Sequence, residues 1–541
     1  MDRMPAPQPR RFSRRDFLKL SGVGAGSILG SGFLGGTAMA GGLRLLAPEA
    51  LALARVYPRN ARDAAALATI DDTHAIFPDG SAEFLLWPGD RTKLDKLGLE
   101  YRITVANLRN DLSTGRRATG LEPQPGERTA YRVLNDYVLD LQALATQHPD
   151  KARVFEYPLL SLEGRKVYGI EIAANVHAVD GRPTVCMDGV HHAREWPAAE
   201  LPHMFGYDLL QSYGTDPRVT AIMDNARVVL TSVMNPDGFD HSRSAPTDTD
   251  PGSYLAYWRK NERSYTDLFY STANVDAHGT DPNRNYPFFW GGEGGNTDPQ
   301  DQTYAGSAPY AEPESRNIAN MMKSRQVTSY LTHHTYGKLV MRPWGNTSDP
   351  SPDNDFQRDL GAQIVAINKY TNQIGLQLYP TSGTSRDWSY DALRTIVYTF
   401  EHGTAFHPAY LSTVPAQYAL NRIPFLLVME AGVNPENHGV IVGRVVDAAG
   451  APVAATIRAR KSFDTLTAAE ARIPETIDTT APTRPDGTFE FHVNPSTRPR
   501  TIMQGGGPEA WDISIEAPGG THATQLVIDR GDRVDLETIT I

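Results

Sequence analysis

A histidine and a glutamate three residues apart form the first group in this sequence that could do chemistry. His192 and Glu195 lie between an apolar run that predicts a strand, Pro183–Met187, and a predicted helix, Pro197–Leu210. The proline of that helix falls in its first turn, where a missing N–H costs little. Imidazole and carboxylate bind zinc at about 2.0–2.2 Å, and a catalytic zinc requires a third protein ligand and an open position. The spacing therefore indicates two metal ligands at a strand-to-helix corner.

A further histidine must complete such a site, and a strand-like run far downstream offers two. His333 and His334 are adjacent in Tyr330–Tyr336. On chemistry alone, either of them could be the third ligand. Without that ligand the His192 and Glu195 pair is a weak signal, since a glutamate at a helix start near a surface histidine has the same spacing.

Four short motifs, taken in chain order, resemble those of the zinc carboxypeptidases of the carboxypeptidase A type. They are His192-Ala193-Arg194-Glu195-Trp196, Asn283-Arg284-Asn285, His334-Thr335-Tyr336 and Thr399-Phe400-Glu401, and the resemblance covers about residues 130 to 433. It implies one zinc ion per chain, bound by His192, Glu195 and His334. His191 and His333 are then expected to point to the opposite sides of their strands, as polar core residues or supports for the ligands.

The resemblance also implies roles for two carboxylates near the zinc. Glu401 ends the apolar run Thr395–Phe400 and is expected to be the general base, with its basicity raised by burial at the strand end. The alternative for Glu401 is a structural salt bridge. Asp281 is expected to accept a hydrogen bond from His192 and fix its tautomer.

An arginine is expected to stabilise the charge that develops on the substrate carbonyl oxygen. The family carries it in a Trp-Arg-Lys element, and Trp258–Lys260 supplies Arg259. The separation from Arg259 to Arg284 is longer than the family usually shows, so part of residues 265–279 is expected to bulge outward. Arg263 is the second candidate, and the structural alternative for Arg259 is an ion pair with Glu262 on a helix face.

The substrate clamp is expected in Asp281–Tyr286. Arg284 and Asn283 offer a planar fork and an amide, which suit bidentate capture of a terminal carboxylate. By resemblance, Tyr379 closes over that carboxylate. Arg194 and Tyr336 are expected to line the approach for residues upstream of the scissile bond.

Arg386 falls where the family places the floor of the pocket for the terminal side chain. A guanidinium there would bind an acidic side chain and repel a basic one. The sequence therefore predicts a preference for acidic C-terminal residues, with Glu favoured by its longer reach. The alternative is that Arg386 folds back on Asp387 or reaches solvent, which would leave an apolar pocket.

The elements that must position these residues alternate between helical and strand-like periods. The expected elements are the helix 131–146, a hairpin of 154–157 and 166–172, the strand 227–233 followed by a turn at 235–238, and strands beginning near Val327 and Thr395. This order predicts an α/β fold, a mixed twisted sheet flanked by helices, with the active site at strand ends.

Changes in pattern divide the chain into four parts. They are an export signal at 1–40, an α+β region resembling a pro-segment at 41–125, the catalytic domain at 126–434 and a β-sandwich at 437–541. Strands are expected at 82–87 and 101–105, with a helix at 93–97 between them. The sandwich is similar to transthyretin-like or carboxypeptidase regulatory-like modules, and contact with other proteins or surfaces is a role it could have.

The first part has the features of a removable signal with twin arginines. Arg14 and Arg15 precede a Gly-rich apolar run and Ala38–Ala40. This predicts export to the periplasm or the cell exterior, with no integral membrane part after the signal is removed. A net charge of −11 argues against a nucleic-acid partner, and the single Cys186 excludes an internal disulfide.

The leading functional hypothesis is an exported zinc carboxypeptidase that removes single C-terminal residues from peptides. A second is a peptidase or amidase of cell-wall peptides, which would use the same zinc without the carboxylate clamp. A third is a catalytically silent binding protein, which usually loses the base or a metal ligand. Asn283, Arg284 and Tyr379 favour the first hypothesis, and the presence of Glu401 argues against the third.

Overall fold

The computed structural model describes residues 51–67, 70, 75–77, 79–87, 89–106, 130–243, 256–262 and 278–541. The predicted export signal, Arg263 and most of the expected bulge at 265–279 lie outside the described residues. The chain divides into two compact units, residues 1–111 and 112–541, and each is described by itself.

The first unit contains a four-stranded antiparallel sheet of order β2-β3-β1-β4. The strand and helix predictions for this region are confirmed. The elements are β1 (Ala52–Tyr57), α2 (Ala61–Leu67), β2 (Ala75–Ile76), β3 (Ala82–Leu86), α3 (Asp90–Leu97) and β4 (Glu100–Val105).

An eight-stranded mixed sheet of order β11-β10-β12-β9-β7-β8-β6-β5 forms the centre of the second unit. The strands are β5 (Ala152–Glu156), β6 (Tyr168–Ile172), β7 (Thr184–Gly189), β8 (Arg227–Thr231), β9 (Val327–His334), β10 (Leu339–Arg342), β11 (Thr371–Ile374) and β12 (Ile396–Glu401). The four central strands β12, β9, β7 and β8 are parallel neighbours, and β5 and β6 form the predicted hairpin. The carboxyl ends of the four central strands therefore meet at one edge of the sheet.

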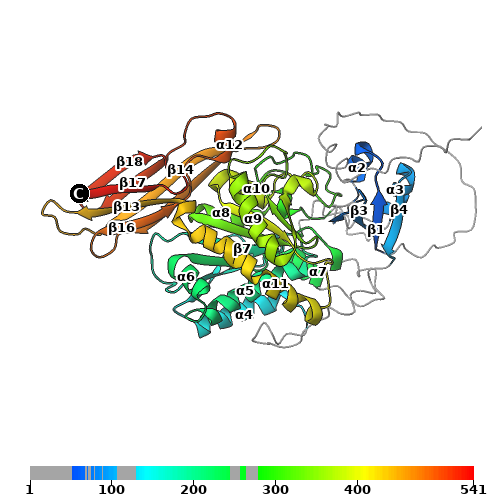
Figure 1. Cartoon of the computed structure of the whole chain (residues 1–541), viewed down its shortest axis with the longest axis horizontal. Helices are drawn as coiled ribbons and strands as arrows, with labels where there is room; N and C mark the ends of the chain where they lie inside the picture. The colour runs from blue at the N-terminus through cyan, green and yellow to red at the C-terminus, as the bar shows by residue number, and fades with distance from the viewer. Residues whose placement is uncertain are drawn as a thin grey trace, which may run out of the picture. The chain divides into compact units, whose positions relative to one another are not determined.

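Helices cover both faces of this sheet, as predicted (Figure 1). One face packs against α4 (Leu134–Gln147), α5 (Trp196–Ser212), α6 (Pro217–Asn225), α9 (Asn354–Asn368) and α11 (Tyr410–Val433), and the other against α8 (Pro313–Lys323) and α10 (Ser385–Leu393). The central strands are buried on both faces, which is why β7, β8 and β12 have continuous apolar runs at their middles. None of the described helices combines the length and apolarity needed to cross a bilayer.

The turn predicted at 235–238 is wrong, because the helix α7 (Pro236–Arg243) begins there. Pro236 occupies the first helical position, where its missing N–H costs nothing. The Asn235 side-chain oxygen accepts from the Gly238 N–H at 3.1 Å and satisfies one of the first amides of the helix. Asn, Pro, Asp and Gly therefore serve as a helix start in this context.

The C-terminal region is a β-sandwich of two sheets, β16-β13-β19 and β15-β14-β17-β18 (Figure 1). Its strands are β13 (Gly439–Val446), β14 (Thr456–Leu466), β15 (Arg472–Pro482), β16 (Thr488–Val493), β17 (Trp511–Ala517), β18 (Gly520–Leu526) and β19 (Arg533–Thr540), with the short helix α12 (Pro499–Met503). Burial alternates along β14 and β15, so one side of each strand faces the sandwich core.

The sandwich is joined to the catalytic sheet through its core and through buried ion pairs. One hydrophobic cluster includes Tyr330 and Trp388 of the catalytic region together with Trp511 and Phe489 of the sandwich. The Trp388 indole N–H donates to Glu475 of β15 at 2.8 Å. The two regions therefore share a hydrophobic cluster, and a buried hydrogen bond joins a side chain of one region to a side chain of the other.

Asp353 is the centre of an ionic contact across this junction. Its carboxylate accepts from Arg394 Nε at 2.9 Å and from Arg530 Nε at 3.0 Å, and Arg530 belongs to the sandwich. Burial alone would raise the pKa of Asp353, but Arg530 and Arg394 hold it well below its usual range. The carboxylate thus stays ionised and pairs with both arginines.

We expect Asp353→Asn to lower the free energy of unfolding at pH 7 by about 3 kcal/mol, because it removes the carboxylate that pairs with the largely buried guanidinium groups of Arg530 and Arg394, and among the described residues only Arg394 keeps a second carboxylate partner, Asp529. The folded pKa lies below the unfolded value of about 3.9, so this stabilisation is present above about pH 4 and is lost as the pH falls through the folded pKa. Denaturant unfolding of both proteins at pH 7 and pH 3 measures it. Asp355→Asn, at an exposed carboxylate, is the matched control; equal stability of all three proteins at pH 7 would contradict the assignment.

Candidate metal centre and active site

The ends of the parallel strands bring together the residues that the sequence analysis singled out. His334 is the last residue of β9 and Glu401 the last of β12, and the two are register partners in the sheet. Gly189 ends β7 opposite His333. His192 and Glu195 follow in the loop between β7 and α5. The fold thus places residues more than 200 positions apart in sequence at one edge.

One nitrogen from each of His192 and His334 and a carboxylate oxygen of Glu195 lie within 4.8 Å of one another. His192 Nδ1 is 2.7 Å from Glu195 Oε1, and His334 Nδ1 is 3.0 Å from Glu195 Oε2. The two Nδ1 atoms are 3.2 Å apart. All three side chains are buried.

The hydrogen bond on the far side of His192 decides what this group can hold. His192 Nε2 lies 3.1 Å from Asp281 Oδ1, and an ionised carboxylate only accepts, so Nε2 donates. In the tautomer with the proton on Nε2, the lone pair of His192 Nδ1 points toward Glu195 and His334. Burial lowers the pKa of His334, which favours its neutral form. Two imidazole lone pairs and a carboxylate that converge in a buried space fit a cation, and two histidines with a glutamate are one of the ligand sets of catalytic zinc sites.

His333 and His191 differ in where they point. His333 Nδ1 lies 2.9 Å from His402 Nε2, and its ring packs edge-on against Phe425 of α11. It thus points away from His192, Glu195 and His334, which together are called the metal group below. His191 instead stacks on His334, with ring centroids 5.6 Å apart. The expectation that His191 lies on the opposite side of a strand is wrong, because β7 ends at Gly189 and the chain turns at Val190, where φ is 60°.

Asp281 connects the metal group to the arginine expected to stabilise the oxyanion. Its Oδ2 accepts from Arg259 Nε at 3.0 Å and Nη2 at 2.7 Å, and its Oδ1 accepts from the Asn283 backbone N–H at 2.8 Å. Burial alone would raise the pKa of Asp281, but Arg259, His192 and Arg284 hold it well below its usual range. Arg259 thus pairs with Asp281, and this pair holds its guanidinium beside the metal group.

The residues expected to clamp a carboxylate lie next to the same group. Asn283 and Arg284 are in a single turn of 3-10 helix, Pro282–Arg284, and Asn283 Nδ2 is 3.4 Å from His334 Nε2. Arg284 Nε donates to the Gly294 carbonyl at 2.6 Å, which fixes the guanidinium. The half-buried Tyr379 ring lies 5.9 Å from that guanidinium. The fork, the amide and the phenol are therefore close together.

Arg194 and Tyr336 are brought together by a residue that the sequence analysis missed. The Arg194 guanidinium lies 4.7 Å from the centre of the Phe406 ring, and the Tyr336 ring contacts the same ring edge-on at 5.0 Å. Phe406 lies outside the recognised motifs, so its sequence position gave no signal. All three side chains are buried.

Arg386 is buried and folds back on Asp387, which is the alternative that the sequence analysis gave for this residue. Its Nε and Nη2 donate to the two carboxylate oxygens of Asp387 at 2.8 and 3.1 Å, and Nη2 lies 3.3 Å from Thr381 Oγ1. The guanidinium packs against the backbone of Gly375 and Gly345, where an added Cβ would come within 2.4 Å of its atoms. Two glycines thus make the space that the guanidinium occupies.

The chain is similar in sequence to known zinc carboxypeptidases. The sequence model of the family described as zinc carboxypeptidase matches residues 137–417. Carboxypeptidase A1 of Rattus norvegicus is 26% identical over 323 residues, which cover 57% of this chain and 72% of that protein. Carboxypeptidase B of Homo sapiens is 26% identical over 61% of this chain and 78% of that protein. A zinc carboxypeptidase of Simulium vittatum is 30% identical over 50% of this chain and 85% of that protein.

Solved structures show the same fold. The crystal structure of thrombin activatable fibrinolysis inhibitor matches with a TM-score of 0.59 at 20% identity, over 71% of this chain and 98% of that chain. A carboxypeptidase A from Helicoverpa armigera matches with a TM-score of 0.58, also at 20% identity and over the same shares of the two chains.

Proposed function

The chain belongs to the zinc carboxypeptidase family, whose enzymes hydrolyse peptides at their C-termini, and from this premise we propose the roles of its residues and its specificity. One zinc ion is held by His192, Glu195 and His334, and the enzyme removes single C-terminal residues with a preference for acidic ones. The observation that carries the proposal is the buried convergence of these three side chains beside the clamp of Asn283 and Arg284.

Zinc bound there supplies Lewis-acid chemistry, since it polarises a carbonyl and lowers the pKa of water to about 7. Asp281 keeps His192 in the tautomer that presents Nδ1 to the ion. The surrounding protein excludes bulk water, because the three ligands are buried. The chain thus contributes three buried ligands, and the hydrogen bond from His192 to Asp281 fixes the tautomer of one of them.

Glu401 is the proposed general base. It is half-buried at the end of β12, less enclosed than the sequence suggested, and it is the register partner of His334. A carboxylate so placed takes a proton from water as the water oxygen bonds to the scissile carbonyl carbon. It then gives that proton to the amine nitrogen as the C–N bond breaks.

Arg259 is the proposed partner of the negative charge that develops on the carbonyl oxygen. Asp281 holds one edge of its guanidinium through Nε and Nη2, so the group is oriented before the substrate binds. A positive group fixed in advance in a buried site stabilises developing charge at little reorganisation cost.

Asn283 and Arg284 are proposed to bind the free carboxylate of the substrate, and Tyr379 to cover it. This clamp limits cleavage to the last peptide bond, which is the reason for preferring an exopeptidase. A cell-wall peptide hydrolase with the same zinc is the second candidate, and nothing in its chemistry requires a fork and an amide beside the metal group. A silent binding protein is disfavoured because the base and all three ligands are present.

The acidic preference is argued from Arg386. Nε and Nη2 of this buried guanidinium are engaged by Asp387 and Thr381, which leaves Nη1 for a substrate carboxylate. The side chain is almost completely removed from solvent, so a charge-assisted bond from Nη1 to an acidic side chain is strong. The pair with Asp387 moderates this effect and orients the group.

We expect Glu401→Gln to reduce kcat by at least about 10²-fold, because an amide cannot take the proton from water. Zinc content and thermal stability should stay unchanged, since Glu401 is not one of the proposed ligands. Steady-state kinetics with a C-terminal Glu peptide, together with metal analysis, make the measurement. Glu436→Gln, at an exposed glutamate outside the site, is the control, and near-normal turnover by Glu401→Gln would rule out the role.

We expect kcat/KM to fall in the order Glu, Phe, Lys for otherwise identical peptides. Arg386→Met keeps the length of the side chain and removes its charge, so the ratio of Glu to Phe cleavage should drop by about 10²-fold. Cleavage of the Phe peptide should change little. A native enzyme that cleaves Phe termini faster than Glu termini would show that Arg386 does not select the substrate.

Export by the twin-arginine route, to the periplasm or the cell exterior, is proposed from Arg14 and Arg15. We expect replacement of both by Lys to leave the precursor inside the cell, because the pair is the recognised feature of such signals. Fractionation of cells followed by immunoblotting measures this. Lys in place of Arg10 and Arg11 is the matched control, and unchanged export of the Arg14 and Arg15 variant would point to another route.

A further inference from the structure

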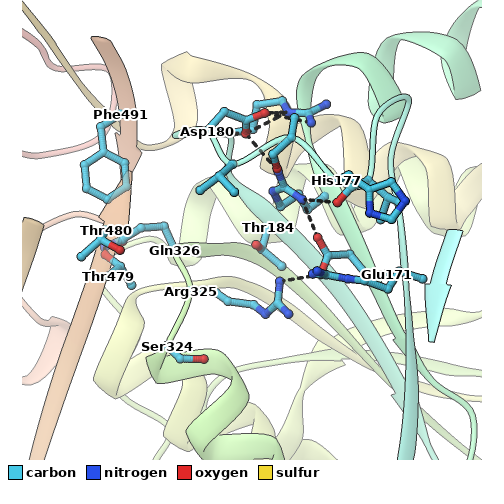
Figure 2. Close-up of a pocket in the computed structure, with 16 residues that line it drawn as sticks. Glu171, His177, Asp180, Thr184, Ser324, Arg325, Gln326, Thr479, Thr480 and Phe491 are labelled. Carbon is cyan, nitrogen blue, oxygen red and sulfur yellow. Dashed lines mark hydrogen bonds and ion pairs between the residues drawn. The ribbon is translucent and has the colours of Figure 1, made fainter. Parts of the chain in front are cut away.

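A second cavity, of about 200 Å³, lies at the amino ends of β7, β8 and β9, at the opposite end of these strands from the metal group (Figure 2). Thr184 and Arg227 begin β7 and β8, and Gln326 precedes β9. The facing wall belongs to the sandwich, with Thr479 and Thr480 of β15 and Phe491 of β16. Both regions of the second unit therefore build this cavity.

The cavity has an excess of positive charge. Four arginines line it, against two carboxylates: Arg153, Arg182, Arg227 and Arg325, with Glu171 and Asp180. The lining thus carries a formal charge of about +2, although the chain as a whole carries −11. A cluster of positive side chains attracts anions, even on a protein whose net charge is negative.

Glu171 is fully buried and receives three of the arginines. Its Oε1 accepts from Arg227 Nη1 at 2.6 Å, and its Oε2 accepts from both Arg153 Nη2 at 2.9 Å and Arg325 Nη1 at 3.1 Å. Burial alone would raise the pKa of Glu171, but the arginines hold it below its usual value. One carboxylate oxygen therefore holds two guanidinium groups side by side, and a single negative charge cannot neutralise them.

Arg182 and Arg227 are already engaged by several partners. Arg182 donates to Asp180 and to the carbonyls of Met223, Asp224 and Asn175. Arg227 donates to the carbonyls of Val176 and Ala178 as well as to Glu171. These two residues fix the floor of the cavity and have little capacity left for a ligand.

Arg153 and Arg325 have that capacity. Each guanidinium carries five N–H groups, and among the described residues each makes its hydrogen bond to Glu171 through one nitrogen only. Their side chains are 49% and 22% exposed, so a ligand can reach them. Figure 2 shows Arg325 directed toward Glu171, with Gln326, Thr479 and Thr480 on its other side.

We propose that this cavity binds a dianionic oxyanion of the phosphate class, held by the forks of Arg153 and Arg325. The excess of about two positive charges matches a dianion better than a monocarboxylate. Guanidinium forks bind phosphate oxygens in pairs. The volume suits a single phosphoryl group, present either as inorganic phosphate or as the end of a phosphate monoester, and is smaller than the usual 300–1,000 Å³ of larger ligand pockets.

The bound anion also strengthens the junction between the catalytic sheet and the sandwich. Gln326 Nε2 donates to Thr479 Oγ1 at 2.7 Å, which fixes β15 against the start of β9. Thr480, one residue further along β15, lines the same cavity from the sandwich side. An anion that contacts Arg325 and Thr480 together therefore stabilises the folded chain in proportion to its binding.

The test is titration calorimetry on the full zinc-loaded chain with inorganic phosphate, glycerol phosphate and acetate, each followed by thermal unfolding. We expect one site per chain for phosphate or for the monoester, a rise of Tm with its concentration, and at least tenfold weaker binding of acetate. The double variant Arg153→Gln with Arg325→Gln should weaken binding at least tenfold and leave kcat/KM unchanged. Arg358→Gln, at an exposed arginine paired with surface carboxylates, should bind as the native chain does.

Two further variants keep the test decisive. Thr480→Val alters only one exposed hydroxyl and should weaken binding several-fold even if the double variant fails to fold. Arg284→Gln separates this cavity from the active site, and it should leave binding intact. The proposal is overturned if neither phosphate nor the monoester binds, if acetate binds equally well, or if binding is lost in Arg284→Gln and kept in the Arg153 and Arg325 variants.

Discussion

The buried carboxylate of Asp281 is the interaction on which the geometry of the site depends. Its two oxygens accept hydrogen bonds from His192, from Arg259 and from the backbone of Asn283. A buried negative charge is costly unless it is paired, and here the pairing groups are residues for which we propose a role in metal binding or catalysis. The ion pair therefore sets the tautomer of His192, the direction of Arg259 and the start of the turn that carries the carboxylate clamp.

The parallel strands supply the rest of the geometry. His334 and Glu401 occupy equivalent positions on β9 and β12, and the loop after β7 carries His192 and Glu195. In such a sheet the strand ends form a crevice in which ligands bind. A proposed metal ligand and the proposed base thus come from neighbouring strands because of register, while their backbones are held by the sheet.

The opposite ends of the same strands have a different chemistry. There the sandwich covers the sheet, and arginines gather around Glu171. Buried ion pairs, such as that of Asp353 with Arg530, and a shared hydrophobic cluster make the junction a part of the folded core. The sandwich is thus a structural component of the second unit, and the proposed anion site lies where the two regions meet.

The sequence by itself determined the residue types of the site, the class of fold and most of the strands. Zinc chemistry restricts ligands to a few side chains, and burial on both faces makes the middles of β7, β8 and β12 apolar. Both features can be recognised in a short stretch of sequence. The tertiary structure alone decided that Arg386 pairs with Asp387 between two glycines, that His191 stacks on His334 after the turn at Val190, and that Asn235 begins a helix. It alone brought Arg153, Arg227 and Arg325 to Glu171. Such contacts depend on the packing of segments far apart in the chain, and neither residue spacing nor hydrophobic period carries that information.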